Sequence, residues 1–255
     1  MKNKENLAIF ISGGGSTCEA IIKHLQQVNN GIEPTLVISS TTEAGGIAKA
    51  KFLGVETVVM NSALFKKCNF GKELVKFLQE KEITMVSLNG YLKLMPVEVI
   101  NQYKGKIINQ HPGPIGTGDE YNFGGKGMIG ENVHLARVIF SSMTEENDWT
   151  EVNIHHVEAE FDTGKLIKIG KIDFELPFHN LNQEEVIKNL QVLKEIAHEN
   201  QQRLLPIEHE TVIKALDEYA NVGYFPLYFR KDILIKPEQR DILEFSKKIT
   251  LDSVK

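Results

Sequence analysis

The sequence predicts an α/β fold in which a mainly parallel, doubly wound sheet carries helices on both faces. Short apolar runs alternate with segments of helical periodicity over the first half of the chain. This alternation is typical of βαβ units with right-handed crossovers. The runs are also continuously apolar rather than alternating with polar residues, as in strands that are buried on both faces. Together these observations indicate a parallel sheet covered by helices.

Each expected strand of the first half is an apolar run followed by small or polar residues. These strands are expected at 7–11, 35–38, 56–60, 85–88 and 107–109. Helices are expected between them at about 18–28, 43–53 and 70–80, where apolar residues recur at helical spacing. Ser16 or Thr17 is expected to cap the first helix. The elements in this order predict a Rossmann-like arrangement.

The second half follows a different pattern, because residues 112–130 contain too many glycines for a regular element. Further on, a helix is expected at 133–140 and two strands at 152–157 and 166–169, joined around a turn at Asp162. A long helix is expected from Gln183 to Leu205, with Asn180 or Asn182 as its cap and Pro206 after its end, and a helix again at 211–219. Residues 224–229 fit a strand or an aromatic clip, and residues 237–248 a last helix.

The length of 255 residues is sufficient for a substantial core. We expect one main domain over residues 1–220 and a C-terminal extension over 221–255 packed on that domain. The net charge of −5 provides no electrostatic footprint for nucleic acid. The apolar run Leu7–Ile11 is too short for a signal peptide or a membrane span.

The two cysteines, Cys18 and Cys68, do not have the spacing of a metal-ligand pair. So few cysteines favour a reduced, cytoplasmic interior. We therefore expect a cytoplasmic protein that acts on small molecules, without metal, nucleic acid or membrane partners, as a monomer or a homodimer.

Asn109 and His111 form the strongest candidate for chemistry. They follow the apolar run Lys106–Ile108, and ligands in α/β proteins bind at the ends of such strands. Residues two apart on an extended segment point the same way. An amide donor beside a titratable imidazole suits a reaction that builds negative charge on a carbonyl oxygen. Taken alone, however, His111 before Pro112 would more often be an ordinary turn histidine.

The turn Gly13-Gly14-Gly15-Ser16-Thr17 joins the first strand to the first helix. Backbone N–H groups there can bind an anion at the helix N-terminus. A dinucleotide fingerprint would need glycine where Cys18 stands and an acid near Ser39 and Ser40, and the Gly-Lys-Ser/Thr of a P-loop is absent. A site for a single phosphate remains, or a glycine turn that serves packing alone.

Five separated segments, in order over residues 6–220, resemble the 10-formyltetrahydrofolate-dependent formyltransferases, in particular those acting on phosphoribosylglycinamide (GAR). The segments are Ile11–Ser16, Asn89–Pro96, Asn109–Pro112, Phe123–Met128 with Val133-His134, and His155 with Asp162-Thr163-Gly164. They are similar to the family's I-S-G-x-G-S turn, its folate loop, its N-x-H-P motif, an F-G-G-K-G-M…V-H stretch of some bacterial members and its H…[DE]-x-x-D-x-G segment.

The resemblance implies transfer of a formyl group from the co-substrate 10-formyltetrahydrofolate to the primary amine of GAR, in de novo purine biosynthesis. It assigns an oxyanion to Asn109 and a protonated His111, with Asp162 pairing with His111 and orienting it. It assigns the substrate phosphate to the glycine turn at residues 13–17. The implied folate-binding residues are Gly90, Tyr91, Leu92, Lys93, Leu94 and Val99, and the implied substrate-binding residues are His155, Gln201 and Lys67.

Three departures from the family pattern concern the acceptor substrate. Gly113–Gly116 replaces the usual S/A-L-L-P and is followed by extra residues at 117–122. Lys66 or Lys67 stands nearest to a family arginine, and neutral Gln201 occupies the position of a family glutamate. These changes leave two alternatives open: a formyltransferase for another amine, such as a nucleotide-sugar amine, or a non-catalytic folate-binding regulator.

The remaining polar candidates are weaker. His155 and His156 are adjacent in an expected strand, so they face opposite sides and cannot form a tight metal pair. One of them is expected at the site and the other at the surface. His134 fits a packing or hydrogen-bonded histidine of a helix better than a site residue. Lys126 fits an anion contact and a solvated loop lysine equally well.

Overall fold

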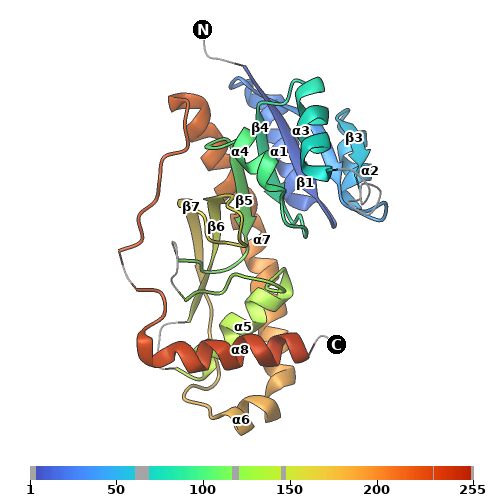
Figure 1. The fold of residues 1–255 in the computed structure, drawn as a ribbon. Coiled ribbons are helices and arrows are strands. Elements are labelled where there is room, and N and C mark those ends of the chain that lie inside the picture. Colours follow the sequence, from blue (N-terminus) through green and yellow to red (C-terminus); the bar gives the residue numbers. More distant parts are fainter. Residues whose placement is uncertain (1–3, 61–68, 117–120, 145–147, 232, 254–255) are drawn as a thin grey trace.

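The computed structural model describes residues 4–60, 69–116, 121–144, 148–231 and 233–253. A seven-stranded sheet runs through the molecule in the order β3-β2-β1-β4-β5-β6-β7 (Figure 1). Its parallel strands are β1 (Glu5–Ile11), β2 (Ile32–Ser39), β3 (Glu56–Val59), β4 (Met85–Asn89) and β5 (Ile107–His111). The antiparallel strands are β6 (Trp149–His156) and β7 (Leu166–Asp173). The predicted mainly parallel, doubly wound α/β fold is confirmed.

Helices cover both faces of the sheet, and each face has its own apolar cluster. One face packs against α1 (Ser16–Val28), α2 (Gly46–Phe52) and part of α7 (Leu190–Val222). The other face packs against α3 (Phe70–Glu80) and α4 (Val97–Gln102), a helix that the sequence analysis did not predict. In Figure 1, α5 (Glu131–Ser142), α6 (Gln183–Lys188) and α8 (Arg240–Asp252) lie together, away from β1–β3.

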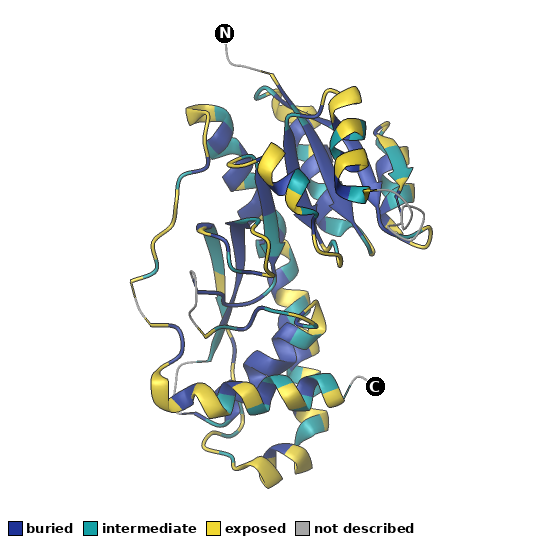
Figure 2. Cartoon of the chain, viewed as in Figure 1, coloured by how far each residue is buried: buried dark blue, intermediate teal, exposed yellow. Residues whose placement is uncertain are grey.

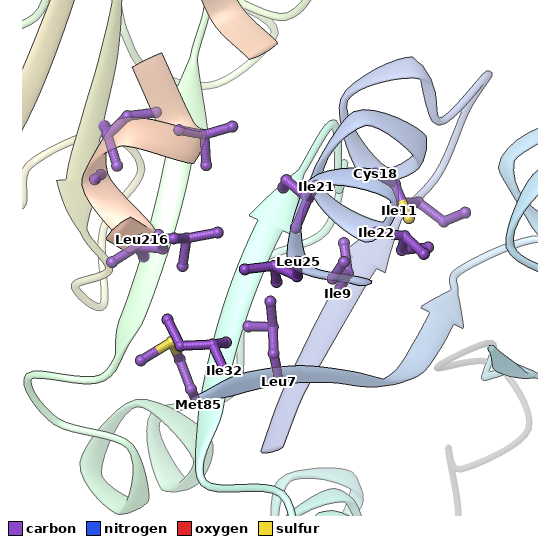
Figure 3. Packing of buried hydrophobic residues seen from close by; sticks show 14 of the residues in the cluster. Leu7, Ile9, Ile11, Cys18, Ile21, Ile22, Leu25, Ile32, Met85 and Leu216 are labelled. Carbon is purple, nitrogen blue, oxygen red and sulfur yellow. The ribbon is translucent and has the colours of Figure 1, made fainter. Parts of the chain in front are cut away.

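The strand β1 shows how the apolar run is divided between the two faces. Leu7, Ile9 and Ile11 belong to the cluster around α1, whereas Ala8 and Phe10 belong to the cluster on the opposite face. All five are fully buried. Figure 2 shows the buried strands between partly exposed helices, and Figure 3 shows the α1 side of this packing. Burial of one such aliphatic side chain contributes about 1.5–3 kcal/mol, so the run stabilises the strand from both sides.

Two predictions about helix ends were wrong. The helix α1 begins at Ser16 with Gly15 as its N-cap in the left-handed region (φ 66°), and no side chain caps it. The helix α7 continues through Pro206 instead of ending before it. Proline inside a helix removes a hydrogen bond and costs about 3 kcal/mol. The buried residues Leu204, Val212 and Ala215, packed against the sheet on both sides of the proline, offset that cost.

The long helix also begins differently from the prediction, because Asn189 separates α6 from α7. Asn182, one of the two predicted caps, forms a capping box with Glu185 at the start of α6. The short 3₁₀ helix η2 (Pro237–Gln239) precedes α8, where a last helix was predicted. None of the helices in the described ranges combines the length and apolarity needed to cross a membrane.

The C-terminal segment after α7 packs against strands β6 and β7 and helix α5. Phe225 is buried against Tyr219, at a ring-centroid distance of 4.7 Å, and also contacts His156. The backbone N–H of Tyr228 donates to the carbonyl of Leu166 at 2.8 Å. Residues 224–229 therefore form the aromatic clip, one of the two structures expected for them, and no strand is present there.

Candidate functional site

A cavity of about 610 Å³ opens at the carboxyl ends of the central strands β1, β4 and β5. This edge is where open α/β sheets bind ligands. The glycine turn after β1, the loop after β4 and the end of β5 form part of its wall, and the loop before α5, the turn after β6 and one face of α7 complete it. Residues that are far apart in the sequence thus share one space large enough for small-molecule ligands.

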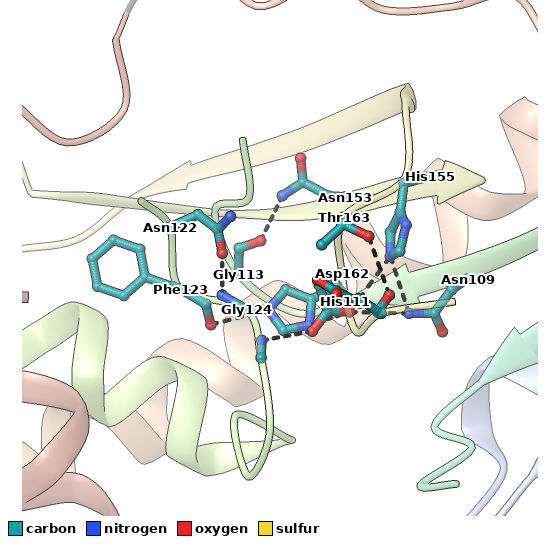
Figure 4. Close-up of polar contacts among 12 residues, drawn as sticks. Asn109, His111, Gly113, Asn122, Phe123, Gly124, Asn153, His155, Asp162 and Thr163 are labelled. Carbon is teal, nitrogen blue, oxygen red and sulfur yellow. Dashed lines mark hydrogen bonds and ion pairs between the residues drawn. The ribbon is translucent and has the colours of Figure 1, made fainter. Parts of the chain in front are cut away.

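Four polar side chains converge within this region (Figure 4). The distance from His111 Nδ1 to Asp162 Oδ1 is 3.4 Å. The Asn109 amide donates to Asp162 Oδ1 at 3.4 Å and lies 3.0 Å from His155 Nε2. His155 Nε2 is 3.6 Å from Asp162 Oδ1. The structure therefore brings together the predicted Asn109, His111 and Asp162. His155, implied as a substrate-binding residue, lies beside them but does not line the cavity.

The pairing of strands explains this arrangement. Asn109 and His111 lie two apart on β5, so they share one side of the strand. The antiparallel register pairs Asn109 with His155 on β6. Adjacent His156 consequently points the other way, toward Phe225 and outside the cavity. The expectation that only one of the two histidines belongs to the site agrees with this geometry, although His156 is half-buried rather than exposed.

Asp162 reaches the cluster from a tight turn and has a left-handed backbone conformation (φ 57°). The backbone N–H of Gly125 donates to its Oδ2 atom at 3.0 Å. A Cβ atom at Gly124 would lie only 2.6 Å from the Cβ of Asp162, so the glycine-rich loop must approach closely. The glycines at 124–125 thus allow the carboxylate and its backbone donor to meet.

Asp162 and His111 each affect the pKa of the other. Burial opposes ionisation of Asp162, but His111 and the Gly125 N–H are among the groups that outweigh it and hold the pKa of that carboxyl below its ordinary value. Burial lowers the pKa of His111, although the Asp162 carboxylate favours its charged form. The protonated His111 implied by the resemblance is therefore opposed by burial, while its partner Asp162 is ionised.

The His111 ring lies between two acceptors. Its Nδ1 atom faces Asp162, and its Nε2 atom is 3.3 Å from the carbonyl oxygen of Phe123. A neutral imidazole has one N–H and one basic nitrogen. It can therefore donate to only one of these oxygens and keeps the other nitrogen available for a proton. This is the arrangement of a general acid or base.

His155 orients the Asn109 side chain. Its Nδ1 atom is 2.8 Å from the carbonyl oxygen of His156, which can only accept. The proton of a neutral ring is thereby assigned to Nδ1, and Nε2 accepts from the Asn109 amide. The amide therefore has one firm contact to His155 and one longer contact to Asp162.

His134 lies beneath the site on α5 and fits the packing role considered for it. It is buried, and neither ring nitrogen has a hydrogen-bond partner among the described residues. Burial, together with nearby His111, lowers the pKa of His134 to about 4. The ring is therefore neutral at physiological pH and fills space behind His111.

The predicted anion turn, residues 13–17, lines the cavity throughout. A Cβ atom at Gly13 or Gly14 would have no neighbour within 4 Å, whereas one at Gly15 would lie 2.5 Å from Gly46 Cα. Gly15 is thus required for packing, and Gly13 and Gly14 leave the backbone open. The packing alternative thus holds for Gly15, and the space beside Gly13 and Gly14 is compatible with an anion.

The predicted folate loop contributes only part of its residues to the cavity. Asn89, Gly90, Tyr91 and Leu92 line it, and the Leu92 N–H donates to Ser12 Oγ at 3.0 Å. Lys93 and Leu94 do not line the cavity; both are exposed.

The prediction for Val99 was wrong. This residue lies in the unpredicted helix α4, whose apolar side faces the sheet, and it is fully buried in the core. Lys67 and its alternative Lys66 lie outside the described residues.

The face of α7 contributes Gln201, Leu205 and Glu208 to the wall. Only Gln201 was predicted, although a spacing of four and then three residues could have indicated Glu208. Lys126, for which two interpretations were open, also lines the cavity. No group of three His, Cys, Asp or Glu side chains in the described ranges is placed to hold a metal ion.

Lys247 on α8 is a site neighbour that the sequence analysis missed. Its ammonium donates to the carbonyl of Gly124 at 3.0 Å, beside the backbone donor of Asp162. Its charge lowers the pKa of His111 and is attracted by Asp162. The helix that contributes it lies far along the chain, and no local pattern indicates where its side chain points.

Replacing Lys247 by methionine is expected to move the acid limb of the pH–rate profile to higher pH. The lysine charge lowers the pKa of His111, so its removal raises that pKa. The profile of kcat against pH, measured for Lys247→Met and for the exposed control Lys248→Met, checks this. A limb that stays in place in Lys247→Met, or moves equally in both variants, would contradict the expectation.

The doubly wound fold, the open glycine turn and the Asn109–His111–Asp162 cluster together form a polar, titratable site at the sheet edge. Residues 5–117 match the family model described as formyl transferase. The match ends within the loop where the sequence departs from the family pattern.

Named relatives agree with this match. The chain is 32% identical over 165 residues to phosphoribosylglycinamide formyltransferase, chloroplastic, of Vigna unguiculata, covering 64% of this chain and 50% of that protein. It thus spans about half the length of this relative. The phosphoribosylglycinamide formyltransferase structure from Streptococcus pneumoniae is 26% identical, with a TM-score of 0.56, over 85% of this chain and 99% of that one. The enzyme structure from Coxiella burnetii shares the fold, with a TM-score of 0.66 at 21% identity over 89% of this chain and 92% of that one.

Proposed function

We propose that the protein transfers a formyl group from 10-formyltetrahydrofolate to the primary amine of phosphoribosylglycinamide, a step of de novo purine biosynthesis. The observation that carries this proposal is the shared cavity: the glycine turn and the Asn109–His111–Asp162 cluster line one space. A phosphate at the turn would anchor the acceptor, and the cluster would act on its amine. The relatives of the same family that carry this name support the choice of acceptor.

The cavity residues fit a folate co-substrate beside the acceptor. Tyr91 and Leu92 supply an apolar wall next to Asn89 and Gly90, whose polar groups suit a pteridine ring. When bound, the co-substrate supplies an activated formyl group. The backbone of residues 89–92 would hold it, and the Ser12 contact to Leu92 would join this loop to the phosphate turn.

The reaction forms a bond between the acceptor nitrogen and the formyl carbon and breaks the bond from that carbon to the folate nitrogen. Negative charge develops on the formyl oxygen. Asn109 would donate to it by exchanging its longer, 3.4 Å contact to Asp162, while His155 keeps the amide in place. The acceptor amine loses a proton and the folate nitrogen gains one. His111 would move this proton, and ionised Asp162 would stabilise the imidazolium that forms.

The organisation of the chain belongs to the same proposal. Residues 1–220 would form the formyltransferase domain, and residues 221–255 an extension packed on it. The protein would act in the cytoplasm on small molecules, without metal, nucleic acid or membrane partners, as a monomer or a homodimer. Light scattering of the purified protein would measure the oligomeric state.

The test is formyl transfer to synthetic GAR, followed by the absorbance of the released folate, with His111→Ala as the inactive variant. The exposed His198→Ala is a matched control for removal of an imidazole. We expect turnover in the wild type and in His198→Ala, and loss of turnover in His111→Ala with unchanged thermal melting. Absence of wild-type turnover while folate still binds would overturn GAR as the acceptor and favour another amine or a folate-binding regulator.

A further inference from the structure

Glu208 is the carboxyl group of the cavity that the proposed chemistry does not use. It lies on α7, seven residues after Gln201, and both side chains line the cavity together with Leu205. Glu208 is only 7% exposed. Carboxyl groups are seldom buried to this extent without a partner that favours them.

A short chain of hydrogen bonds holds this carboxyl group in place. The Gln110 amide donates to Glu208 Oε2 at 2.7 Å, and the Asn89 amide donates to Gln110 Oε1 at 3.4 Å. Gln110 and Asn89 stand at the carboxyl ends of β5 and β4 and line the same cavity. Two strands of the sheet thus set the position of Glu208, although it belongs to a helix.

The other carboxylate oxygen, Oε1, has no hydrogen bond to any described residue. Oε1 is not among the fully buried atoms that lack a partner, so it is accessible from the cavity and free to accept from a ligand donor. Burial raises the pKa of Glu208 to about 7, and the hydrogen bond from Gln110 opposes that rise. A hydroxyl or ammonium group entering the cavity would supply the missing donor.

The acceptor is the ligand whose chemistry fits this oxygen. Under the proposed function it carries a phosphate, sugar hydroxyls and an amine, and it spans the distance from the glycine turn to His111. Gln201, at the position of a family glutamate, provides no charge for such donors. Glu208 provides a carboxyl group on the same helix face.

We infer that Glu208, held by Gln110, is the residue that selects the acceptor by binding the hydroxyl or ammonium donors between its phosphate and its reacting nitrogen. This inference rests on the proposed function for the place of the acceptor in the cavity. Glu208 compensates for the neutral side chain of Gln201. The glycine turn would bind the phosphate independently of it.

Binding of three phosphate probes tests the inference. Inorganic phosphate has neither donor group, ribose 5-phosphate carries hydroxyls without an amine, and phosphoethanolamine carries an amine without hydroxyls. Calorimetric titrations would compare the wild type, Glu208→Gln and the exposed control Glu199→Gln, which makes the same charge change on the same helix. Glutamine has nearly the shape of glutamate, and its amide oxygen can still accept from Gln110, so folding should be preserved. Thermal melting checks this.

We expect Glu208→Gln to bind inorganic phosphate as the wild type does, and to bind ribose 5-phosphate or phosphoethanolamine about tenfold more weakly, since hydrogen bonds to charged groups have this magnitude. The probe that loses affinity identifies the donor as hydroxyl or ammonium. Glu199→Gln should match the wild type. Equal affinity of Glu208→Gln and the wild type for all probes would overturn the inference, as would a wild type that binds neither organic probe better than inorganic phosphate.

Turnover with GAR provides an independent readout. Glu208→Gln should raise the KM for GAR about tenfold and leave the KM for 10-formyltetrahydrofolate unchanged. An equal rise in both KM values would indicate a merely structural role and would contradict the inference. Absence of wild-type turnover would count against the proposed function alone, because the binding selectivity is measured without chemistry.

Discussion

Replacing Asn109 by alanine is expected to lower kcat for formyl transfer about 10²–10³-fold, the usual effect of removing one donor to a developing oxyanion. His155 holds the amide at 3.0 Å, so the donor is already placed before the reaction begins. The interaction strengthens only as charge develops on the formyl oxygen. The KM values for both substrates should therefore change little.

Steady-state kinetics with each substrate varied in turn would measure this effect. Asn101→Ala, which removes an exposed amide from α4 outside the cavity, is a matched control. A similar fall in its kcat would show that the loss is unspecific. A large rise in KM with unchanged kcat for Asn109→Ala would contradict the oxyanion role and indicate ground-state binding instead.

Replacing Gly164 by alanine is expected to destabilise the protein by about 3 kcal/mol and to abolish formyl transfer. A Cβ atom there would lie 1.7 Å from the carbonyl oxygen of His156 and 3.3 Å from His155 Nδ1. Both are fixed by strand β6, so the turn itself must move. That turn delivers Asp162 to His111, and its displacement would break the cluster.

Urea unfolding of Gly164→Ala should show a lower midpoint with an unchanged slope, because the surface exposed on unfolding is the same. Thr163→Ala alters the adjacent residue of the same turn but removes only a partly exposed side chain and its bond to the Glu160 carbonyl. This control should retain most of its stability and activity. A wild-type midpoint for Gly164→Ala would show that the backbone at His156 accommodates the methyl group.

Prediction of the fold from sequence succeeded where local pattern and packing agree. The apolar run of β1 supplies side chains to two cores, as expected for a strand that is buried on both faces. Prediction failed at Pro206 and at Gly15. A helix can continue through proline when buried neighbours offset the lost hydrogen bond, and that burial depends on a sheet formed by distant residues.

The residues of the cluster at the sheet edge also fall into two groups, those that the local pattern predicts and those that it does not. The order of elements and the period of two along β5 place Asn109 and His111 together at the end of a buried strand, and the glycine pattern places an open turn after β1. These properties follow from backbone geometry over a few residues, so the sequence alone determined them. Resemblance to a family added Asp162, whose position no local rule predicts.

Only the tertiary structure decided which of His155 and His156 faces Asn109, that Val99 belongs to the core, and that Glu208 and Lys247 reach the site. Each of these outcomes depends on the register between strands or on the rotation of a helix about its axis. Register and rotation are set by the packing of many side chains from distant segments. A single sequence indicates the local conformation that each segment favours. The contacts that fix register and rotation form only when distant segments pack together in the folded protein.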